Sequence, residues 1–392
     1  MTKRKTAKRK HHHSVARLDR AISRRRLLKA SAVIGTVSLG APWIVRDAFS
    51  SSGEFNFLGW AGYDFKPAFD AFNKKTGITV NFTEQPDQDA MVAQAKAGGA
   101  AGGFDVCEPT ADRIKNWVEQ DFLQPWGDKN INADGIEPGI MNGSAMKPAQ
   151  MGGKLYASPS VWGTESLTFN TDEVKLTYPQ ASLGDLWKDE YAGKVTVRPH
   201  SGLMTIGRWL EGEGKLPKPY DDSFKDEASM TANYDVIIKK ALELKSHVAQ
   251  WWKDENSAQG AFRTNGCVIG NCWDTSAQAL QREGLPIGYL SPKEGAAAWL
   301  QTFVLFKGAK NIAQAEAWVS WVNTPEGALA WAQAYSGNPV AKGAADAAPE
   351  AQKKFLQSAF PGDALNKLWW WPEQASWFVS KRNEYADRFQ AG

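Results

Sequence analysis

Few residues in this chain suit a metal or a redox cofactor. The 392 residues include only 3 cysteines and 5 histidines, and three of the histidines form one run at His11, His12 and His13. No Cys-x-x-Cys pair occurs, which argues against an iron–sulfur or zinc cluster. No glycine-rich phosphate loop follows a predicted strand. His200 and His247 have no acid or nucleophile at the spacing of a triad. The sequence therefore predicts no cofactor and no enzyme, including an exported redox enzyme.

The chain also lacks a hydrophobic run long enough to span a membrane. The apolar stretch from Ala30 to Val45 has about 16 residues, whereas a bilayer requires about 20. Ser-Arg-Arg-Arg-Leu-Leu-Lys precedes it at residues 23–29, and paired arginines before a short apolar run are typical of a twin-arginine export signal. We expect a signal over residues 1–50 and a periplasmic protein. The alternative is a buried amphipathic helix with a basic flank.

Outside this segment the chain has no excess of basic residues. The first 50 residues hold 13 Lys/Arg and 2 Asp/Glu out of 46 and 43 in the whole chain, which leaves 33 basic and 41 acidic residues, a net charge of −8. Such a balance indicates no nucleic-acid or anionic-membrane surface. The histidine run belongs to the same basic leader.

Disulfides are also disfavoured. Cys267 and Cys272 lie on one apolar run, and five residues of a strand span about 16 Å, beyond disulfide reach. We expect buried thiols here and at Cys107, with a disulfide of Cys107 as the alternative.

The hydrophobic pattern alternates between the periods of strands and helices. Strands are predicted at 55–58, 78–82, 104–107, 166–170, 195–197, 267–273, 287–290 and 302–305. Helices are predicted at 65–76, 89–97, 111–119, around 205, at 234–245 and 276–283, and over much of the last 80 residues. This alternation predicts an α/β protein with a mostly parallel sheet. Ligand sites in such sheets lie at the carboxyl ends of strands, where Trp60, Tyr63, Thr110 and Asp112 follow.

Several blocks occur in the order of one known family. They are Gly59–Tyr63, Lys75–Val80, Phe104–Val106, Tyr156–Pro159 with Trp162–Thr164 and Asn170, Leu186–Trp187, Tyr191–Lys194, Lys293–Gly295, Trp299 and Gly337–Pro339. Together they cover about residues 54–345. In these blocks the chain resembles the polyamine-binding (spermidine/putrescine) branch of the solute-binding proteins of ABC transporters.

This resemblance implies the type II periplasmic-binding-protein fold, in which two α/β lobes are joined by two crossings and capture ligand in the cleft between them. The crossings would lie near Gly163–Glu165 and Trp273–Ser276. One lobe would combine residues 53–164 with 275–322, and the other 165–274 with 323–392. The expected partners are a small-molecule solute, a membrane ABC permease and, during export, the twin-arginine translocase, with the protein itself a monomer.

The resemblance also implies a cation site of aromatic rings and carboxylates, since ring faces attract ammonium groups and carboxylates bind them through charge-assisted bonds. Trp60, Tyr63, Trp162, Trp273 and Trp299 keep aromatic positions. The family's acids are replaced: Gly62 stands for the first, Asp112 for a tyrosine, and residues 200–203 for an acidic pair. The expected ligand residues are Trp60, Tyr63, Thr110, Asp112, Trp162, His200, Trp273, Asp274 and Trp299.

The expected ligand is a small organic amine or polyamine-like solute. Asp112, Glu165 and Asp274 are the carboxylates that compensate for the replaced acids. The cluster Trp369–Trp371 is assigned to packing. The alternatives are a sugar, an organic acid, or a sensor-coupled role with the same fold.

Overall fold

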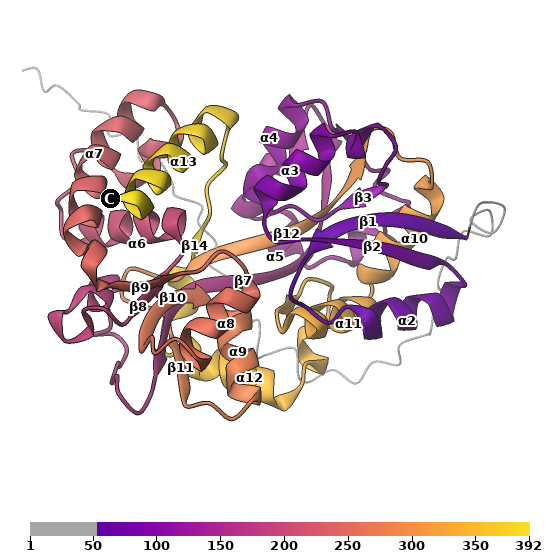
Figure 1. Cartoon of the computed structure of the whole chain (residues 1–392). Coiled ribbons are helices and arrows are strands. Elements are labelled where there is room, and N and C mark those ends of the chain that lie inside the picture. The colour runs from indigo at the N-terminus through magenta and orange to yellow at the C-terminus, as the bar shows by residue number, and fades with distance from the viewer. Residues whose placement is uncertain (1–52) are drawn as a thin grey trace, which may run out of the picture. The chain divides into compact units, whose positions relative to one another are not determined.

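The computed structural model describes residues 53–392, so the predicted twin-arginine signal at residues 1–50 lies outside the described residues. Figure 1 shows the alternation of strands and helices. The strands are β1 (Glu54–Trp60), β2 (Thr79–Gln85), β3 (Val106–Cys107), β4 (Leu123–Gln124), β5 (Gln150–Met151), β6 (Lys154–Leu155), β7 (Ala157–Asn170), β8 (Val195–Val197), β9 (Val248–Trp251), β10 (Ile269–Trp273), β11 (Ile287–Leu290), β12 (Ala297–Phe306), β13 (Asn338–Pro339) and β14 (Trp369–Trp370). The helices are α2 (Lys66–Thr76), α3 (Gln88–Lys96), α4 (Ile114–Glu119), α5 (Pro138–Met141), α6 (Pro199–Gly212), α7 (Glu227–Leu244), α8 (Glu255–Arg263), α9 (Asp274–Arg282), α10 (Ile312–Val322), α11 (Pro325–Tyr335), α12 (Glu350–Ala359) and α13 (Ser376–Ala391).

The main sheet is mixed, so the prediction of a mostly parallel sheet is wrong. Its main path runs β2-β1-β3-β12-β7-β10-β8-β9. β1 pairs in parallel with β2 and β3, and β8 pairs in parallel with β9 and β10. β12 and β7, in the middle, pair antiparallel with each other and with β3 and β10. The local hydrophobic period of the sequence predicts the strands and helices of the outer, parallel parts of the sheet. It carries no information about the direction of the central strands.

β7 and β12 form the centre of the sheet. β7 has 14 residues, so it begins nine residues before the predicted strand 166–170. β12 lies along β7 in register from Ala297 opposite Glu165 to Val304 opposite Ala157, with one irregularity between Gln301 and Thr302. Figure 1 shows both strands running through the middle of the sheet.

The buried side chains form two large hydrophobic clusters and two smaller ones, the last made of three alanines. The first cluster draws on residues 55–161, on 252–273 and on 299–340. The second draws on residues 167–269, on Leu290 and on 378–389. The third lies around Tyr289 and Phe355. Both large clusters therefore combine parts of the chain that are distant in sequence, and β7 contributes to each of them.

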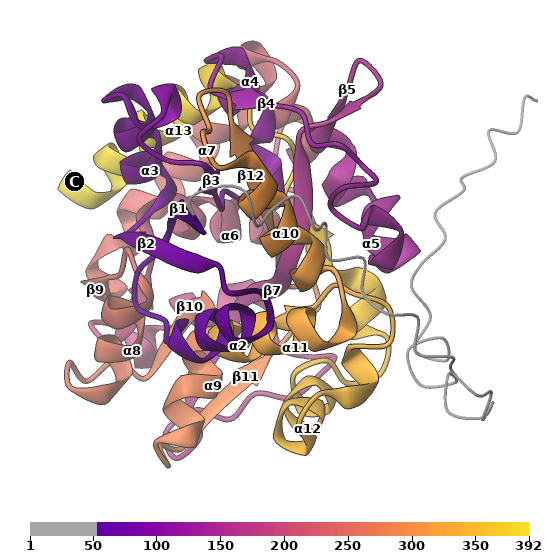
Figure 2. The ribbon, with the colours of Figure 1, turned by 90° about the vertical axis from the view of Figure 1, so that its right-hand side faces the viewer.

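The first helix shows how the local sequence sets its boundaries. α2 ends at Gly77, which adopts φ 76° and donates its amide to the Asn73 carbonyl over 2.7 Å. This left-handed position favours glycine. Phe65, directly before α2, stacks on Trp331 of α11 with ring centroids 4.6 Å apart. Figure 2 shows α2 and α11 lying side by side next to β1 and β2.

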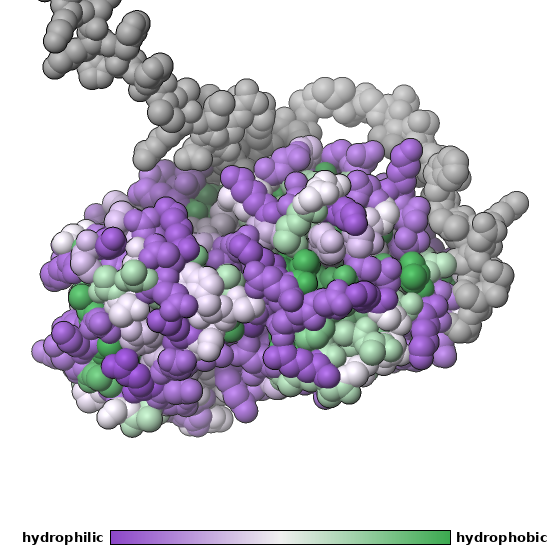
Figure 3. Space-filling view, turned by 90° about the horizontal axis from the view of Figure 1, so that it is seen from above, coloured by the Kyte–Doolittle hydropathy of each residue, from purple (hydrophilic) through white to green (hydrophobic). Residues whose placement is uncertain are grey.

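One face of the molecule is mostly hydrophilic and the three thiols are buried, as the sequence composition suggests. The face shown in Figure 3 is mostly hydrophilic, with small separated hydrophobic patches. None of the helices described over residues 53–392 is long and apolar enough to cross a membrane. Cys107, Cys267 and Cys272 are buried free thiols. No cluster of three or more potential metal ligands is found within the same residues.

Candidate functional site

A cavity of about 320 Å³ opens beyond the carboxyl ends of β1 and β10. Its walls include residues of both large hydrophobic clusters. Seven of the nine residues expected from the sequence line it: Trp60, Tyr63, Thr110, Asp112, His200, Trp273 and Trp299. Trp162 and Asp274 do not line it. The structure thus brings most of the expected set together in one place.

Indole rings form one wall of this cavity. Trp60 ends β1 and Trp273 ends β10, and their rings meet edge to face with centroids 6.2 Å apart. The Trp60 Nε1–H donates to the Glu108 carbonyl over 2.8 Å, which fixes the ring. Trp299 lies against Gly163, where a Cβ would stand 2.2 Å from its ring, so only glycine fits there. The wall is therefore held in place before any ligand arrives.

Tyr63 is fixed through a buried carboxylate outside the cavity. Its hydroxyl donates to Glu255 Oε2 over 3.2 Å, and that oxygen also accepts from Ser276 Oγ at 2.8 Å. Gly62 makes this possible, because a Cβ at Gly62 would lie 3.0 Å from the Glu255 Cβ. Where the resembled family has an acid, this chain has a glycine against which a distant glutamate packs.

Two expected ligand residues have structural surroundings instead. Trp162 packs against Trp370 with ring centroids 6.0 Å apart. Asp274 is fully buried at the start of α9, where its Oδ1 accepts the Thr275 amide over 3.0 Å. Burial raises the pKa of Asp274 to about 8. Neither side chain faces the cavity.

Glu165 is a buried carboxylate in the wall of the cavity. It lies on β7 and lines the cavity, and its Oε1 accepts from Asn271 Nδ2 over 2.6 Å. Its Oε2 is buried and accepts no hydrogen bond of good geometry, although Ser201 and Trp273 lie close enough to act to lower the pKa of Glu165. Burial raises the pKa of Glu165 to about 7, against the attraction of Arg198. A buried acceptor without a donor is costly, so this oxygen is well suited to a ligand N–H.

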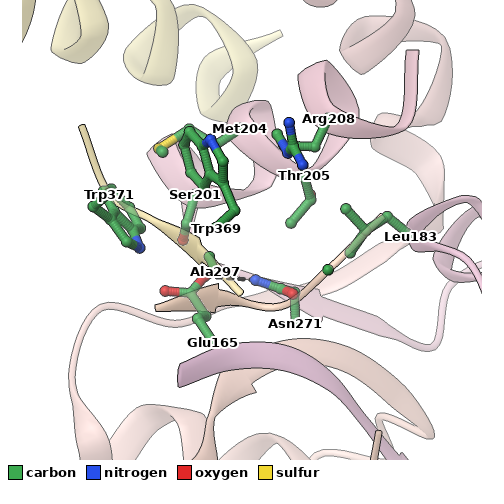
Figure 4. Close-up of a pocket in the computed structure, with 11 residues that line it drawn as sticks. Glu165, Leu183, Ser201, Met204, Thr205, Arg208, Asn271, Ala297, Trp369 and Trp371 are labelled. Atoms are coloured by element: carbon green, nitrogen blue, oxygen red, sulfur yellow. Dashed lines mark hydrogen bonds between the residues drawn. The ribbon is translucent and has the colours of Figure 1, made fainter. Parts of the chain in front are cut away.

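A second, smaller cavity of about 20 Å³ adjoins the first and shares Glu165 and Trp371 with it. Figure 4 shows Trp369, Met204 and Ser201 on one side of this space, and Glu165 and Asn271 on the other. Ser201 Oγ, like Glu165 Oε2, is buried without a partner. A space of this size accommodates one water molecule. The polar side-chain atoms around Glu165 are therefore only partly hydrogen-bonded.

The remaining walls carry charges that sequence reasoning missed. Arg113, Arg198 and Arg382 line the cavity, together with Asp89. Arg113 Nη2 donates to Asp89 Oδ1 over 3.0 Å, and Arg382 Nη2 lies 3.8 Å from Asp89 Oδ2. Although burial acts to raise it, these two arginines lower the pKa of Asp89 to about 2. Arg382 lies on α13, beyond the part of the chain that carries the family resemblance, so no sequence block marks it.

Asp112 and His200 complete the polar lining. Asp112 Oδ2 accepts from Gln374 Nε2 over 2.7 Å, and burial raises the pKa of Asp112. His200 opens α6 with its ring 6.2 Å from that of Trp371. Burial, and then Arg198, Arg382 and Arg113, lower the pKa of His200 well below its usual value, so the ring is neutral at neutral pH.

Thr110 donates its amide to Gln88 Oε1 over 3.0 Å and so joins the start of α3 to this wall.

The comparisons with known proteins agree with this geometry. The family of bacterial extracellular solute-binding proteins matches residues 67–357. Spermidine/putrescine-binding periplasmic protein 1 of Haemophilus influenzae is 26% identical over 253 residues, which cover 64% of this chain and 65% of that protein, just under two thirds. The spermidine/putrescine-binding periplasmic protein of Escherichia coli is 24% identical over 340 residues, covering 86% and 91%.

Solved structures show the same fold. A putative spermidine/putrescine ABC transporter protein from Listeria monocytogenes superposes with a TM-score of 0.69 at 21% identity, over 86% of this chain and 99% of the other. A spermidine/putrescine substrate-binding protein from Streptococcus pneumoniae gives a TM-score of 0.66 at 21% identity, over 86% and 98%. These likenesses establish the two-lobed fold of the periplasmic binding proteins.

A rigid aromatic wall beside a cavity of ligand size, at the carboxyl ends of strands, is typical of a small-molecule binding site. The chain belongs to the family of bacterial extracellular solute-binding proteins, whose members bind small solutes for ABC transporters.

Proposed function

We propose that this protein captures a small organic amine or polyamine-like solute in the 320 Å³ cavity and delivers it to a membrane ABC permease. The observation that carries the proposal is Glu165 Oε2, a buried acceptor without a donor beside the indoles of Trp273 and Trp371. An ammonium group would supply the missing donor, and the ring faces would attract its charge. The relatives named for spermidine and putrescine support the same ligand class.

The mechanism we propose is closure of two lobes over the solute. The lobes predicted from the sequence are 53–164 with 275–322 and 165–274 with 323–392. Packing favours one change, because Trp331 and Tyr335 belong to the first hydrophobic cluster, so residues 323–340 go with the first lobe. A ligand held by both lobes favours the closed state through its higher affinity for that state.

Export by the twin-arginine route to the periplasm, and a monomeric state there, complete the proposal. The support for export is the Ser-Arg-Arg-Arg-Leu-Leu-Lys pattern before a short apolar run, together with the names of the periplasmic relatives. The alternative of a sensor-coupled protein differs only in its membrane partner.

Calorimetry with the signal-free protein tests the ligand class. We expect an amine to bind more tightly than neutral sugars and simple organic acids. Glu165→Gln should weaken amine binding at least tenfold, because the ligand ammonium then loses the charged acceptor at Glu165. Asp346→Asn is a matched control, since Asp346 is exposed and does not line the cavity.

The proposed closure of the two lobes over the solute is tested separately. Small-angle scattering should give a smaller radius of gyration with ligand, and the melting temperature should rise with ligand concentration. A sugar as the tight ligand would refute the amine proposal, and tight binding without any change in the radius of gyration would refute closure.

A further inference from the structure

Three arginines from distant parts of the chain meet at the solute cavity. Arg113 lies in the short 3₁₀ turn Ala111–Arg113, Arg198 precedes α6, and Arg382 lies on α13. All three line the cavity, and all three act to lower the pKa of His200, which lines it too. The neutral His200 adds no charge, and the acids of the same cavity are Asp87, Asp89, Asp112, Glu165 and Asp387.

Two of these arginines already have protein partners. Arg113 is paired with Asp89 at 3.0 Å. Arg382 donates to Gln374 Oε1 over 2.7 Å and to Asn383 Oδ1 over 2.8 Å. Their side chains are 4% and 3% exposed. They form a fixed, buried positive background in which Asp89 is the one acid that contacts them within 4 Å among residues 53–392.

Arg198 has no such partner. Among the hydrogen bonds and ion pairs of the described residues, none involves its guanidinium. Instead, its central carbon lies 5.3 Å from the ring centroid of Trp273 and 5.5 Å from that of Trp252. The two indoles hold the group by cation–π attraction while leaving its N–H donors available. Glu165 attracts it electrostatically without bonding to it.

We propose that the captured solute carries an oxyanion, a carboxylate or a phosphate-like group, which binds Arg198, in addition to the amine that binds Glu165. This inference rests on the proposed amine function and narrows it to an amino acid or another aminated acid. A planar guanidinium binds an oxyanion through paired N–H donors. A free guanidinium enclosed in a closing cleft without an anion is unfavourable.

A bare polyamine fits this cavity less well. An ammonium group placed beside Arg198 would meet the like charge of a guanidinium that no hydrogen bond or ion pair of the described residues engages, and like charges repel strongly when they are partly buried. A solute with both charges matches Glu165 and Arg198, which line the same cavity without bonding to each other.

A four-carbon ligand series tests the inference by calorimetry on the signal-free protein. It consists of 1,4-diaminobutane, 4-aminobutanoate, 2-aminobutanoate and butanedioate, which differ mainly in the groups they present. We expect one of the amino acids to bind at least tenfold more tightly than the diamine. Arg198→Gln should weaken that amino acid at least tenfold and leave the diamine unchanged or tighter. Arg263→Gln is the matched control, because Arg263 pairs with Glu283 away from the cavity.

Arg198→Lys keeps the charge but loses the paired donors, so we expect a partial loss of amino-acid affinity. This second variant, checked by circular dichroism, separates ligand binding from a folding defect of Arg198→Gln. If the diamine binds most tightly of the four compounds, and Arg198→Gln strengthens its binding further, the inference is overturned. The amine function would still stand. Tightest binding of butanedioate would refute the amine function itself.

If none of the four compounds binds, mass spectrometry of the solute released from natively exported protein decides the question. A solute with both an amine and an acidic group supports the inference. An amine without an acidic group overturns it.

Discussion

The buried carboxyl of Glu108 should make the stability of this protein depend on pH. Glu108 accepts from Ser160 Oγ at 2.5 Å, from Trp331 Nε1 at 2.9 Å and from Tyr335 OH at 2.6 Å. Even so, burial raises its pKa to about 7. Glu108→Gln replaces it with a neutral group of the same shape, whose amide N–H₂ can donate to the Tyr335 oxygen and whose oxygen keeps the other two donors.

The size of this effect on the unfolding free energy follows from the pKa shift of Glu108. A rise from 4.5 to about 7 corresponds to about 3 kcal/mol. Because the folded-state pKa is above the unfolded value, this stabilisation is fully present below about pH 4.5 and is lost as the pH rises through about 7. The unfolding free energy of the natural protein, minus that of Glu108→Gln, should therefore fall by about 3 kcal/mol from about pH 4 to about pH 8.

Urea denaturation followed by circular dichroism, at several pH values, measures this difference. Glu84→Gln is the control, since Glu84 is exposed on β2, and we expect a flat difference for it. A flat difference for Glu108→Gln, or one that rises with pH, would refute the reasoning about desolvation at this site.

Two further predictions concern the cleft and export. Trp60→Ala should weaken solute binding about 5- to 30-fold, or about 1–2 kcal/mol, through lost cation–π contact and packing; calorimetry that finds unchanged affinity would remove Trp60 from the site. Replacing Arg24 and Arg25 by Lys should leave full-length protein in the cytoplasm, and immunoblots of cell fractions that still show a shortened periplasmic form would contradict the twin-arginine interpretation.

The aromatic half of the site could be predicted from the sequence, but the charged half could not. Trp60 and Trp273 end strands whose periodicity is visible, Tyr63 comes shortly after the first of them, and strand ends are where ligands bind. Arg198 lies at an equivalent strand end, but nothing local indicates that Trp252 and Trp273 flank it. Arg382 reaches the cavity only because α13 packs in the second cluster with α6 and α7. Such long-range packing leaves no short sequence signal.

The same limit applies to the sheet. The parallel pairs of β1 with β2 and β3 follow from local strand–helix alternation. The antiparallel centre requires β12 to lie against β7, more than a hundred residues earlier in the chain. Gly163 was expected at a crossing, but its close fit to the Trp299 ring depends on that pairing.

The way in which the two large hydrophobic clusters are divided along the chain also governs when the protein can fold during synthesis. The first cluster includes both Phe55 and Val340, and the second includes both Leu167 and Phe389. Neither core can close on the ribosome from an early, contiguous segment, and contacts at such sequence separation form slowly. Each core is therefore completed only after the residues near Val340 and Phe389 have been synthesised. If the proposed twin-arginine export is correct, translocation of the folded protein would have to follow the docking of α13.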